Sequence, residues 1–201
     1  MKTVIVTGGI GSGKSAVCAC LKKRGVPVYD CDSKAKGLYS RRPSLVSQLE
    51  IALGAPLKGA DGRLDKARLA ALIFSNPHAR ETLEGIVYPI LLEDIRRWQQ
   101  RQTAPWGVLE SAIILSKPVF DGVADGVVLV DAPEEVRMAR VMRRDGLEPE
   151  AVISRIRSQE IPRDKADVII LNDGTPQVLS EAVERVFFHK NSYISKLISQ
   201  V

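Results

Sequence analysis

One short segment near the N-terminus constrains the fold of this chain more than any other part of the sequence. Residues 8–15 read GGIGSGKS, a full match to the pattern G-x-x-x-x-G-K-[ST]. The segment lies between an apolar run at 3–7 and a helical pattern at 14–24, which is the context in which such a loop wraps around phosphate. A Rossmann loop or a plain glycine turn would account for the glycines, but not for the Lys-Ser pair at this place.

The loop also carries two side chains with a chemical role. Lys14 is expected to reach the β- and γ-phosphates of a bound nucleotide, and the Ser15 hydroxyl is expected to ligate Mg²⁺. The motif therefore predicts a binding site for a nucleoside triphosphate.

Short β-branched runs alternate with longer helical patterns along the rest of the chain. This alternation predicts a doubly wound α/β fold of three layers, with a five-stranded parallel sheet. The expected strands are 3–7, 26–29, 107–110, 127–131 and 168–171. The expected helices outside the middle of the chain are 14–24, 133–145, 149–160 and 176–199.

Composition is that of an ordinary globular protein. The 201 residues have a hydrophobic content of 45% and a net charge of +5, which fits one core domain and excludes disordered and fibrous classes. The mild charge favours a small polyanionic ligand over nucleic acid, and the apolar runs are too short to span a membrane. We expect a cytoplasmic protein whose cysteines are reduced. These are Cys18, Cys20 and Cys31.

The stretch 33–105 is too long for a simple crossover between two strands. It contains helical patterns at 43–53 and 65–74, and a third helix is expected to open at Asn76-Pro77, with Asn as the cap and Pro in the first turn. We therefore expect a helical insertion that carries the second substrate.

Three carboxylates follow predicted strands, where ligands bind in open α/β sheets. Asp30 and Asp32 follow the second strand, and one of them is expected to accept or orient the proton of an acceptor hydroxyl. Glu110 ends the third strand and resembles a carboxylate that supports Mg²⁺ through water. Capping of the following helix remains an alternative for each of the three.

A cluster of arginines follows the fourth strand. Arg137, Arg140 and Arg144 share one helical face, with Arg143 alongside. Such a cluster suits a lid that closes on triphosphate and stabilises the transition state. A solvated basic face is the alternative, and it has more weight for Arg137 and Arg143 than for Arg140 and Arg144.

Taken together, these motifs resemble the dephospho-coenzyme A kinase family along nearly the whole chain. The loop resembles the family's T-G-G-I-G-S-G-K-S opening, and the later matches keep its order and spacing. They are 25–32 (GVPVYDCD), 73–77 (IFSNP), 110–115 (ESAIIL), 140–145 (RVMRRD), 155–159 (RIRSQ) and 166–172 (ADVIILN).

The resemblance implies ATP-dependent phosphorylation of the ribose 3′-hydroxyl of dephospho-CoA, with Mg²⁺, in a single P-loop kinase domain. It assigns Asp32, Lys14 and Arg140 as catalytic residues, and Ser15 and Glu110 as the metal site. It implies a core of about 1–32, 106–136 and 166–201, an acceptor-binding insertion at about 33–105 and a lid at about 137–165. The implied ATP-binding residues are Gly9, Gly11, Ser12, Gly13, Lys14, Ser15, Ala16, Arg140 and Arg144.

The chain departs from the family at three places: Tyr88 stands for the usual His, Ser116 for the usual Glu, and the span 159–166 is short. ATP and dephospho-CoA are the expected partners of a monomer that binds neither nucleic acid nor membrane. Another small-molecule, nucleoside or nucleotide kinase is one alternative, and a P-loop NTPase switch is the other. The sequence has no N-K-x-D-like motif for guanine.

Overall fold

The computed structural model describes residues 1–159, 161 and 163–199. The chain divides into two compact units, a sheet unit formed by 1–30 with 98–201, and a helical unit formed by 31–97.

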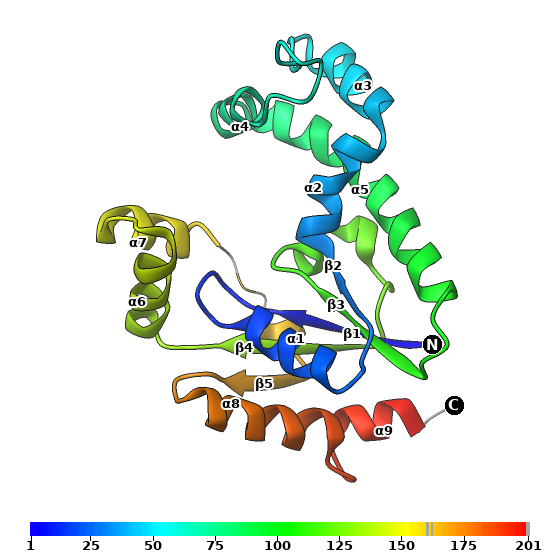
Figure 1. Cartoon of the computed structure of the whole chain (residues 1–201), viewed down its shortest axis with the longest axis vertical. Coiled ribbons are helices and arrows are strands. Elements are labelled where there is room, and N and C mark those ends of the chain that lie inside the picture. The colour runs from blue at the N-terminus through cyan, green and yellow to red at the C-terminus, as the bar shows by residue number, and fades with distance from the viewer. Residues whose placement is uncertain (160, 162, 200–201) are drawn as a thin grey trace. The chain divides into compact units, whose positions relative to one another are not determined.

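All five expected strands are present in the sheet unit (Figure 1). They pair in parallel in the order β2-β3-β1-β4-β5. Their bounds are β1 Lys2–Thr7, β2 Val28–Asp30, β3 Trp106–Glu110, β4 Gly126–Asp131 and β5 Val168–Leu171. The predicted three-layer α/β fold with a five-stranded parallel sheet is confirmed.

One face of the sheet packs against helices from both ends of the chain. The helices are α1 (Lys14–Lys23), α8 (Pro176–Val183), the π-helical turn η4 (Glu184–Phe188) and α9 (Tyr193–Ser199). Their apolar side chains form one cluster with Val4, Val6, Val108, Val128 and Ile170 of the strands. This cluster forms the core between the helices and this face of the sheet, and its buried residues come from four of the five strands.

The opposite face is covered by the end of α5 (Pro77–Gln100) and by the 3₁₀ turns η1 (Ile114–Ser116) and η2 (Pro118–Phe120). The ring of Trp98 lies 5.4 Å from that of Tyr29 on β2. The Gln99 amide donates to the Thr3 hydroxyl at 2.9 Å.

Strand β5 differs from the other strands. All strands were expected to be covered on both faces, but Ile169 and Leu171 are half-exposed. Ile170 between them is buried in the helix-covered core, so the exposed pair lies on the opposite side of this edge strand, where little covers it.

The predicted single helix over 176–199 is wrong. It is interrupted after Phe188, where His189 takes an extended conformation, and α9 then begins anew. Ser192 causes the restart, because its hydroxyl accepts a hydrogen bond from the backbone N–H of Ser195 at 3.0 Å. This is the bond by which serine caps a helix N-terminus.

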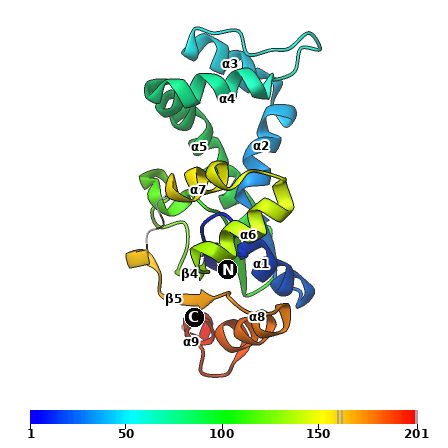
Figure 2. The same ribbon diagram turned by 90° about the vertical axis from the view of Figure 1, so that its left-hand side faces the viewer.

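Helices α6 (Glu134–Asp145) and α7 (Pro149–Arg157) follow the carboxyl end of β4 and lie side by side (Figures 1 and 2). Val141, Val152 and Ile156 form a small core between them. Helix α6 ends at Asp145, and the following Gly146 caps it in a left-handed conformation with φ 63°. Glu160, which was expected to end the second helix, lies outside the described residues.

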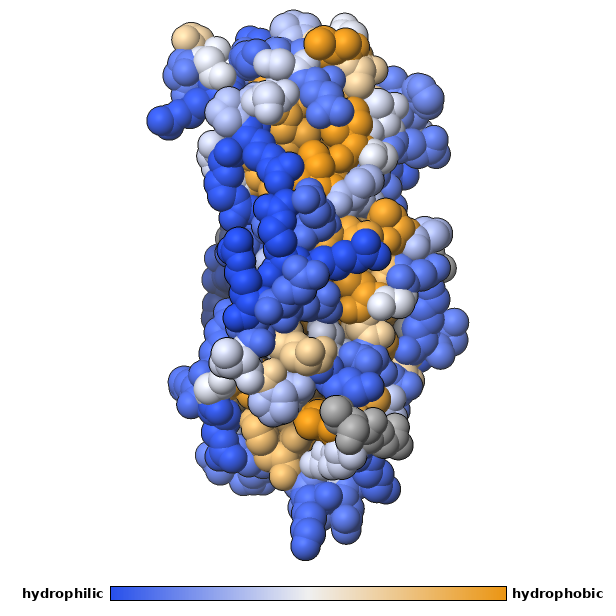
Figure 3. Space-filling model, turned by 90° about the vertical axis from the view of Figure 1, so that its right-hand side faces the viewer, coloured by the Kyte–Doolittle hydropathy of each residue, from blue (hydrophilic) through white to orange (hydrophobic). Residues whose placement is uncertain are grey.

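The helical unit contains α2 (Cys31–Arg41), α3 (Pro43–Leu53), α4 (Lys66–Ser75) and most of α5. Asp65 caps α4 by accepting from the N–H groups of Ala67 and Arg68. Asn76 caps α5, with Pro77 as its first residue, as predicted. On the face shown in Figure 3, hydrophilic residues dominate and apolar side chains gather in patches. None of the described helices is long and apolar enough to cross a membrane.

Removal of a core side chain should destabilise the sheet unit. Leu21 on α1 has no exposed surface, so Leu21→Ala is expected to lower the free energy of unfolding by about 2–5 kcal/mol. The free energy of unfolding is measured by urea denaturation, with tryptophan fluorescence as the signal. Leu171→Ala on the edge strand is the matched control, because Leu171 is 54% exposed. Equal shifts of the two midpoints would contradict this description of the core.

Candidate active site

The register of the sheet brings the predicted functional segments to one edge. Val6 of β1 lies opposite Glu110 of β3, and Glu110 lies opposite Asp30 of β2. On the other side, Thr7 of β1 lies opposite Leu129 of β4. The carboxyl ends of the strands therefore meet where the loop 8–13 leaves β1, as expected for ligand binding in an open α/β sheet.

The loop has the backbone conformation that its glycines allow. Gly11 and Gly13 have φ values of 78° and 95°, which other residues rarely adopt. A Cβ on Gly11 would also lie 2.6 Å from the Arg137 carbonyl oxygen. Both glycines are therefore required by this loop geometry, and α1 begins directly after Gly13.

Arg140 and Asn172 hold the far side of the loop. Arg140 Nη1 donates to the carbonyl oxygens of Asn172 at 3.0 Å and Gly11 at 3.4 Å. Asn172, which follows β5, donates from its amide to the Ser12 carbonyl oxygen at 2.7 Å. We refer to these hydrogen bonds from Arg140 and Asn172 as the clamp on the loop. The clamp uses carbonyl oxygens of the loop, whereas an anion binds to N–H groups, so it is compatible with phosphate binding.

The peptide groups on both sides of Ile10 are also fixed, by Arg137 of α6 and by Gln159, which follows α7. The Ile10 N–H donates to Gln159 Oε1 at 2.6 Å, and Arg137 Nε donates to the Ile10 carbonyl oxygen at 3.0 Å. Arg137 is 8% exposed, so the alternative of a solvated position is wrong for this residue. Burial lowers the pKa of its guanidinium.

Two buried polar atoms beside the loop have no hydrogen-bond partner among the described residues. They are Nη2 of Arg137 and the hydroxyl of Ser12. Buried donors are normally satisfied, so both atoms indicate a place where a further polar group completes the site.

Glu110 contacts the loop side chain that was predicted to hold a metal. Its carboxylate is 7% exposed and accepts a hydrogen bond from the Ser15 hydroxyl. Burial, together with the negative charge of Glu110, raises the pKa of the neighbouring Cys18 thiol. The capping alternative for Glu110 is wrong, because Ser111 caps the following turn by accepting from the N–H groups of Ile113 and Ile114.

The two aspartates after the second strand fall in different elements. Asp30 is the last residue of β2, and Asp32 lies in the first turn of α2, which begins at Cys31. A carboxylate in a first helical turn interacts favourably with the helix dipole. Both side chains are half-buried. The catalytic role of Asp32 remains a prediction.

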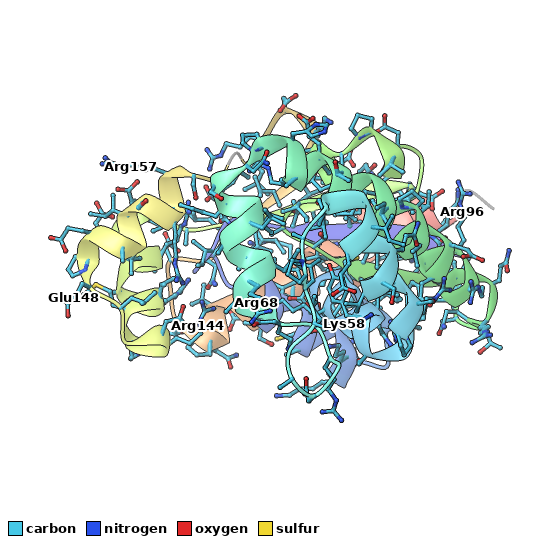
Figure 4. All side chains as sticks on the ribbon, turned by 90° about the horizontal axis from the view of Figure 1, so that it is seen from above. Lys58, Arg68, Arg96, Arg144, Glu148 and Arg157 are labelled. Atoms are coloured by element: carbon cyan, nitrogen blue, oxygen red, sulfur yellow. The ribbon has the colours of Figure 1, made fainter. Side chains whose placement is uncertain are left out.

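The remaining arginines of the cluster face other partners. Arg144 forms two hydrogen bonds with Asp145, at 2.7 and 2.9 Å, which raise the pKa of Arg144 and lower that of Asp145. Arg155 lies 4.0 Å from the same carboxylate. Figure 4 shows Arg144, Glu148 and Arg157 on the pair of helices α6 and α7. Arg143, on α6, is exposed to solvent.

The sequence motifs did not single out Gln159 and Asn172, and Arg137 was named in the arginine cluster with a stronger expectation of a solvated position than Arg140. Gln159 and Asn172 do stand at the ends of the segments 155–159 and 166–172 that resemble family motifs, and that signal could have identified them. Arg137 gave no comparable signal, because a basic residue beside other arginines on a helix is usually solvated.

The sheet order, the clamped loop and the Ser15–Glu110 contact define a P-loop nucleotide-binding protein of the kinase type. The family profile described as dephospho-CoA kinase matches residues 2–177. The chain therefore belongs to the dephospho-CoA kinase family.

Curated relatives agree with this assignment, and a solved structure shares the fold. A dephospho-CoA kinase of Porphyromonas gingivalis is 39% identical over 190 residues, which cover 92% of this chain and 93% of the relative. A dephospho-CoA kinase of Frankia casuarinae is 36% identical, and the match covers 93% of this chain and 82% of that relative. The crystal structure of TT1252 from Thermus thermophilus superposes with a TM-score of 0.80 at 35% identity, covering 92% of this chain and 96% of that one.

Arg137 should support nucleotide binding through the loop. Arg137→Met removes the bond to the Ile10 carbonyl, and a hydrogen bond from a charged group contributes about 1.5–3 kcal/mol. We expect ADP to bind at least about tenfold more weakly in calorimetric titrations. Arg143→Met is the matched control on the same helix and should bind ADP as the wild type does. Wild-type affinity in the Arg137 variant would exclude this role.

Proposed function

We propose that this chain transfers the γ-phosphoryl group of ATP to the ribose 3′-hydroxyl of dephospho-CoA, which gives coenzyme A and ADP in the last step of coenzyme A biosynthesis. In this reaction the 3′-oxygen forms a bond to the γ-phosphorus, and the bond from that phosphorus to the β,γ-bridging oxygen breaks. The observation that carries the proposal is the clamped phosphate loop in a chain that belongs to this family.

ATP binding is assigned to the loop and to two arginines. Gly9 and the residues Gly11–Ala16, which include the start of α1, would hold the phosphates, with Lys14 at the β- and γ-phosphates. Arg140 already lies against the loop, where its charge would stabilise the transition state. Arg144, which now pairs with Asp145, would contact the adenine or the phosphates once it leaves Asp145 for the nucleotide.

Mg²⁺ fits the oxygen atoms that meet at the loop. The Ser15 hydroxyl contacts the Glu110 carboxylate, and oxygen donors of this kind suit a hard cation. Ser15 would ligate the ion and Glu110 would hold it through water. The ion supplies neutralisation of phosphate charge. Among the described residues, no group of three or more His, Cys, Asp or Glu side chains could hold a metal by itself, which agrees with a site completed by phosphate.

Asp32 is assigned as the group that takes the proton of the 3′-hydroxyl or orients it. The insertion at about 33–105 would bind the acceptor, and the segment at about 137–165 would act as the lid over the loop. Little covalent chemistry is left for the protein, so rate enhancement would come from positioning and exclusion of water. We place the enzyme in the cytoplasm as a monomer that acts on its two small substrates alone.

A conservative change at Asp32 tests the catalytic assignment. Asp32→Asn keeps size and polarity but removes the proton acceptor, so we expect kcat to fall by about 10²–10⁴-fold with ADP affinity within twofold of wild type. Coupled ADP-release kinetics and calorimetry measure the two quantities. Asp30→Asn is the neighbouring control. If turnover is unchanged in the Asp32 variant, the residue is not the base.

An acceptor panel tests the reaction itself. Purified protein with Mg²⁺ and ATP should release ADP rapidly with dephospho-CoA, but slowly with adenosine, AMP or no acceptor. Coenzyme A should be identified as the product by mass spectrometry. Stimulation by adenosine or AMP instead would indicate another kinase, and equal ATP hydrolysis under all four conditions would indicate an NTPase switch.

A further inference from the structure

One buried arginine beside the phosphate loop lacks a negatively charged partner. Arg137 on α6 is 8% exposed, and among the described residues it forms no ion pair with a carboxylate. Exposed arginines nearby do have such partners, since Arg144 pairs with Asp145 and Arg163 pairs with Asp131. A buried charge is normally paired, because its removal from water costs free energy. The lack of a partner at the buried position therefore calls for an explanation.

The guanidinium of Arg137 lies directly against the loop. A Cβ on Gly9 would stand 2.8 Å from Nη2 of Arg137 and 3.0 Å from its Cζ. The same Cβ would lie 2.8 Å from Cδ1 of Ile161, so an apolar side chain also covers this place. Nη2 has no hydrogen-bond partner among the described residues. The positive charge is thus held beside the loop and shielded from solvent.

Arg137 approaches the loop from the side of its carbonyl groups. Its Nε donates to the Ile10 carbonyl oxygen at 3.0 Å, and its backbone carbonyl oxygen would lie 2.6 Å from a Cβ on Gly11. An anion binds to the N–H groups of such a loop. The charge of Arg137 therefore reaches a bound phosphate across the loop and not by direct contact.

The one carboxylate that influences Arg137 does not compensate its burial. Glu134 lies one turn earlier on α6 and is exposed. Its negative charge raises the pKa of Arg137, but burial lowers that pKa by more. The surroundings of Arg137 in the nucleotide-free protein thus disfavour its positive charge.

Other cations meet at the same loop. Arg140 lies one turn after Arg137 and donates to the Gly11 carbonyl oxygen at 3.4 Å, and Lys14 follows the last glycine of the loop. Like charges that gather at one place raise the local potential, and a polyanion is attracted to it. The attraction is stronger where water is excluded.

We propose that Arg137 is an electrostatic part of the nucleotide site, whose charge has no partner in the free protein and is neutralised across the loop by the phosphates of the bound nucleotide. The attraction grows with the charge of the ligand, so Arg137 favours the triphosphate over the diphosphate. The inference rests on the proposed function for the identity of the nucleotide, but it does not depend on the acceptor.

Charge and hydrogen bond can be separated at this position. In Arg137→Gln, the side-chain amide nitrogen is as many bonds from Cα as Nε is, so the variant can keep the bond to the Ile10 carbonyl while it loses the charge. In calorimetric titrations with Mg²⁺ and no acceptor, we expect the non-hydrolysable ATP analogue AMP-PNP to bind about tenfold more weakly, and ADP only about threefold more weakly.

The matched control is Arg143→Gln, which removes a charge from an exposed position of the same helix and should bind both ligands as the wild type does. Arg137→Lys keeps the charge and should keep the wild-type ratio of the two affinities. The assignment would be overturned by equal weakening of both ligands in Arg137→Gln, by no weakening, or by the same change of ratio in Arg137→Lys or Arg143→Gln.

Thermal unfolding of the nucleotide-free protein distinguishes this role from a structural one. Because an unpartnered buried charge is destabilising, we expect nucleotide-free Arg137→Gln to unfold at a temperature no lower than wild type and up to about 4 °C higher. Saturating AMP-PNP should raise that temperature less than it does for wild type. A nucleotide-free variant that unfolds several degrees lower would show a structural role and overturn the proposal.

None of these measurements contains dephospho-CoA. A protein that showed the expected binding and unfolding but formed no coenzyme A would contradict the proposed function and leave the role of Arg137 intact. Formation of coenzyme A together with wild-type AMP-PNP binding in Arg137→Gln would do the reverse.

Discussion

The site depends on the position of β1 between β3 and β4. Because β1 pairs in parallel with both neighbours, the end of β1, the end of β3 at Glu110 and the end of β4, which α6 follows, fall at one edge of the sheet. This register lets Glu110 accept from the Ser15 hydroxyl at the start of α1, and it lets Arg140 donate to the loop at Gly11. A slip by one residue would reverse the side chains of β1 and disrupt the core around Val4 and Val6.

Residues from other parts of the chain hold the loop mainly through its carbonyl oxygens, which leaves most of its N–H groups able to bind an anion. Arg140 and Asn172 bind carbonyl oxygens, and Arg137 binds the Ile10 carbonyl. Gln159 accepts from the Ile10 N–H, and the Ser12 N–H donates within the loop to the Gly9 carbonyl oxygen at 3.1 Å. The protein thus fixes the loop geometry in advance, which lowers the ordering cost of binding a polyanion.

The fold was largely predictable because its signals are local. Apolar runs marked the strands, and Asn76-Pro77 marked a helix start, whereas the exposure of β5 and the interruption at Ser192 depend on sheet order and on one side-chain bond. The loop residues and the position of Glu110 were also predictable from the motif and from strand polarity. The burial of Arg137 was not, because it results from packing of α6 on a loop 127 residues earlier in the chain.

The hydrogen bond from Asn172 to the Ser12 carbonyl oxygen links the phosphate loop to the exposed edge strand β5. Asn172 follows directly after β5, the strand with the least cover, and its backbone N–H donates to the Asp131 carbonyl at the end of β4. Fraying of β5 would release the Ser12 carbonyl and Arg140 together. Nucleotide occupancy and closure of this edge are therefore thermodynamically linked, so a bound nucleotide would protect the amides of the outermost strand against hydrogen exchange.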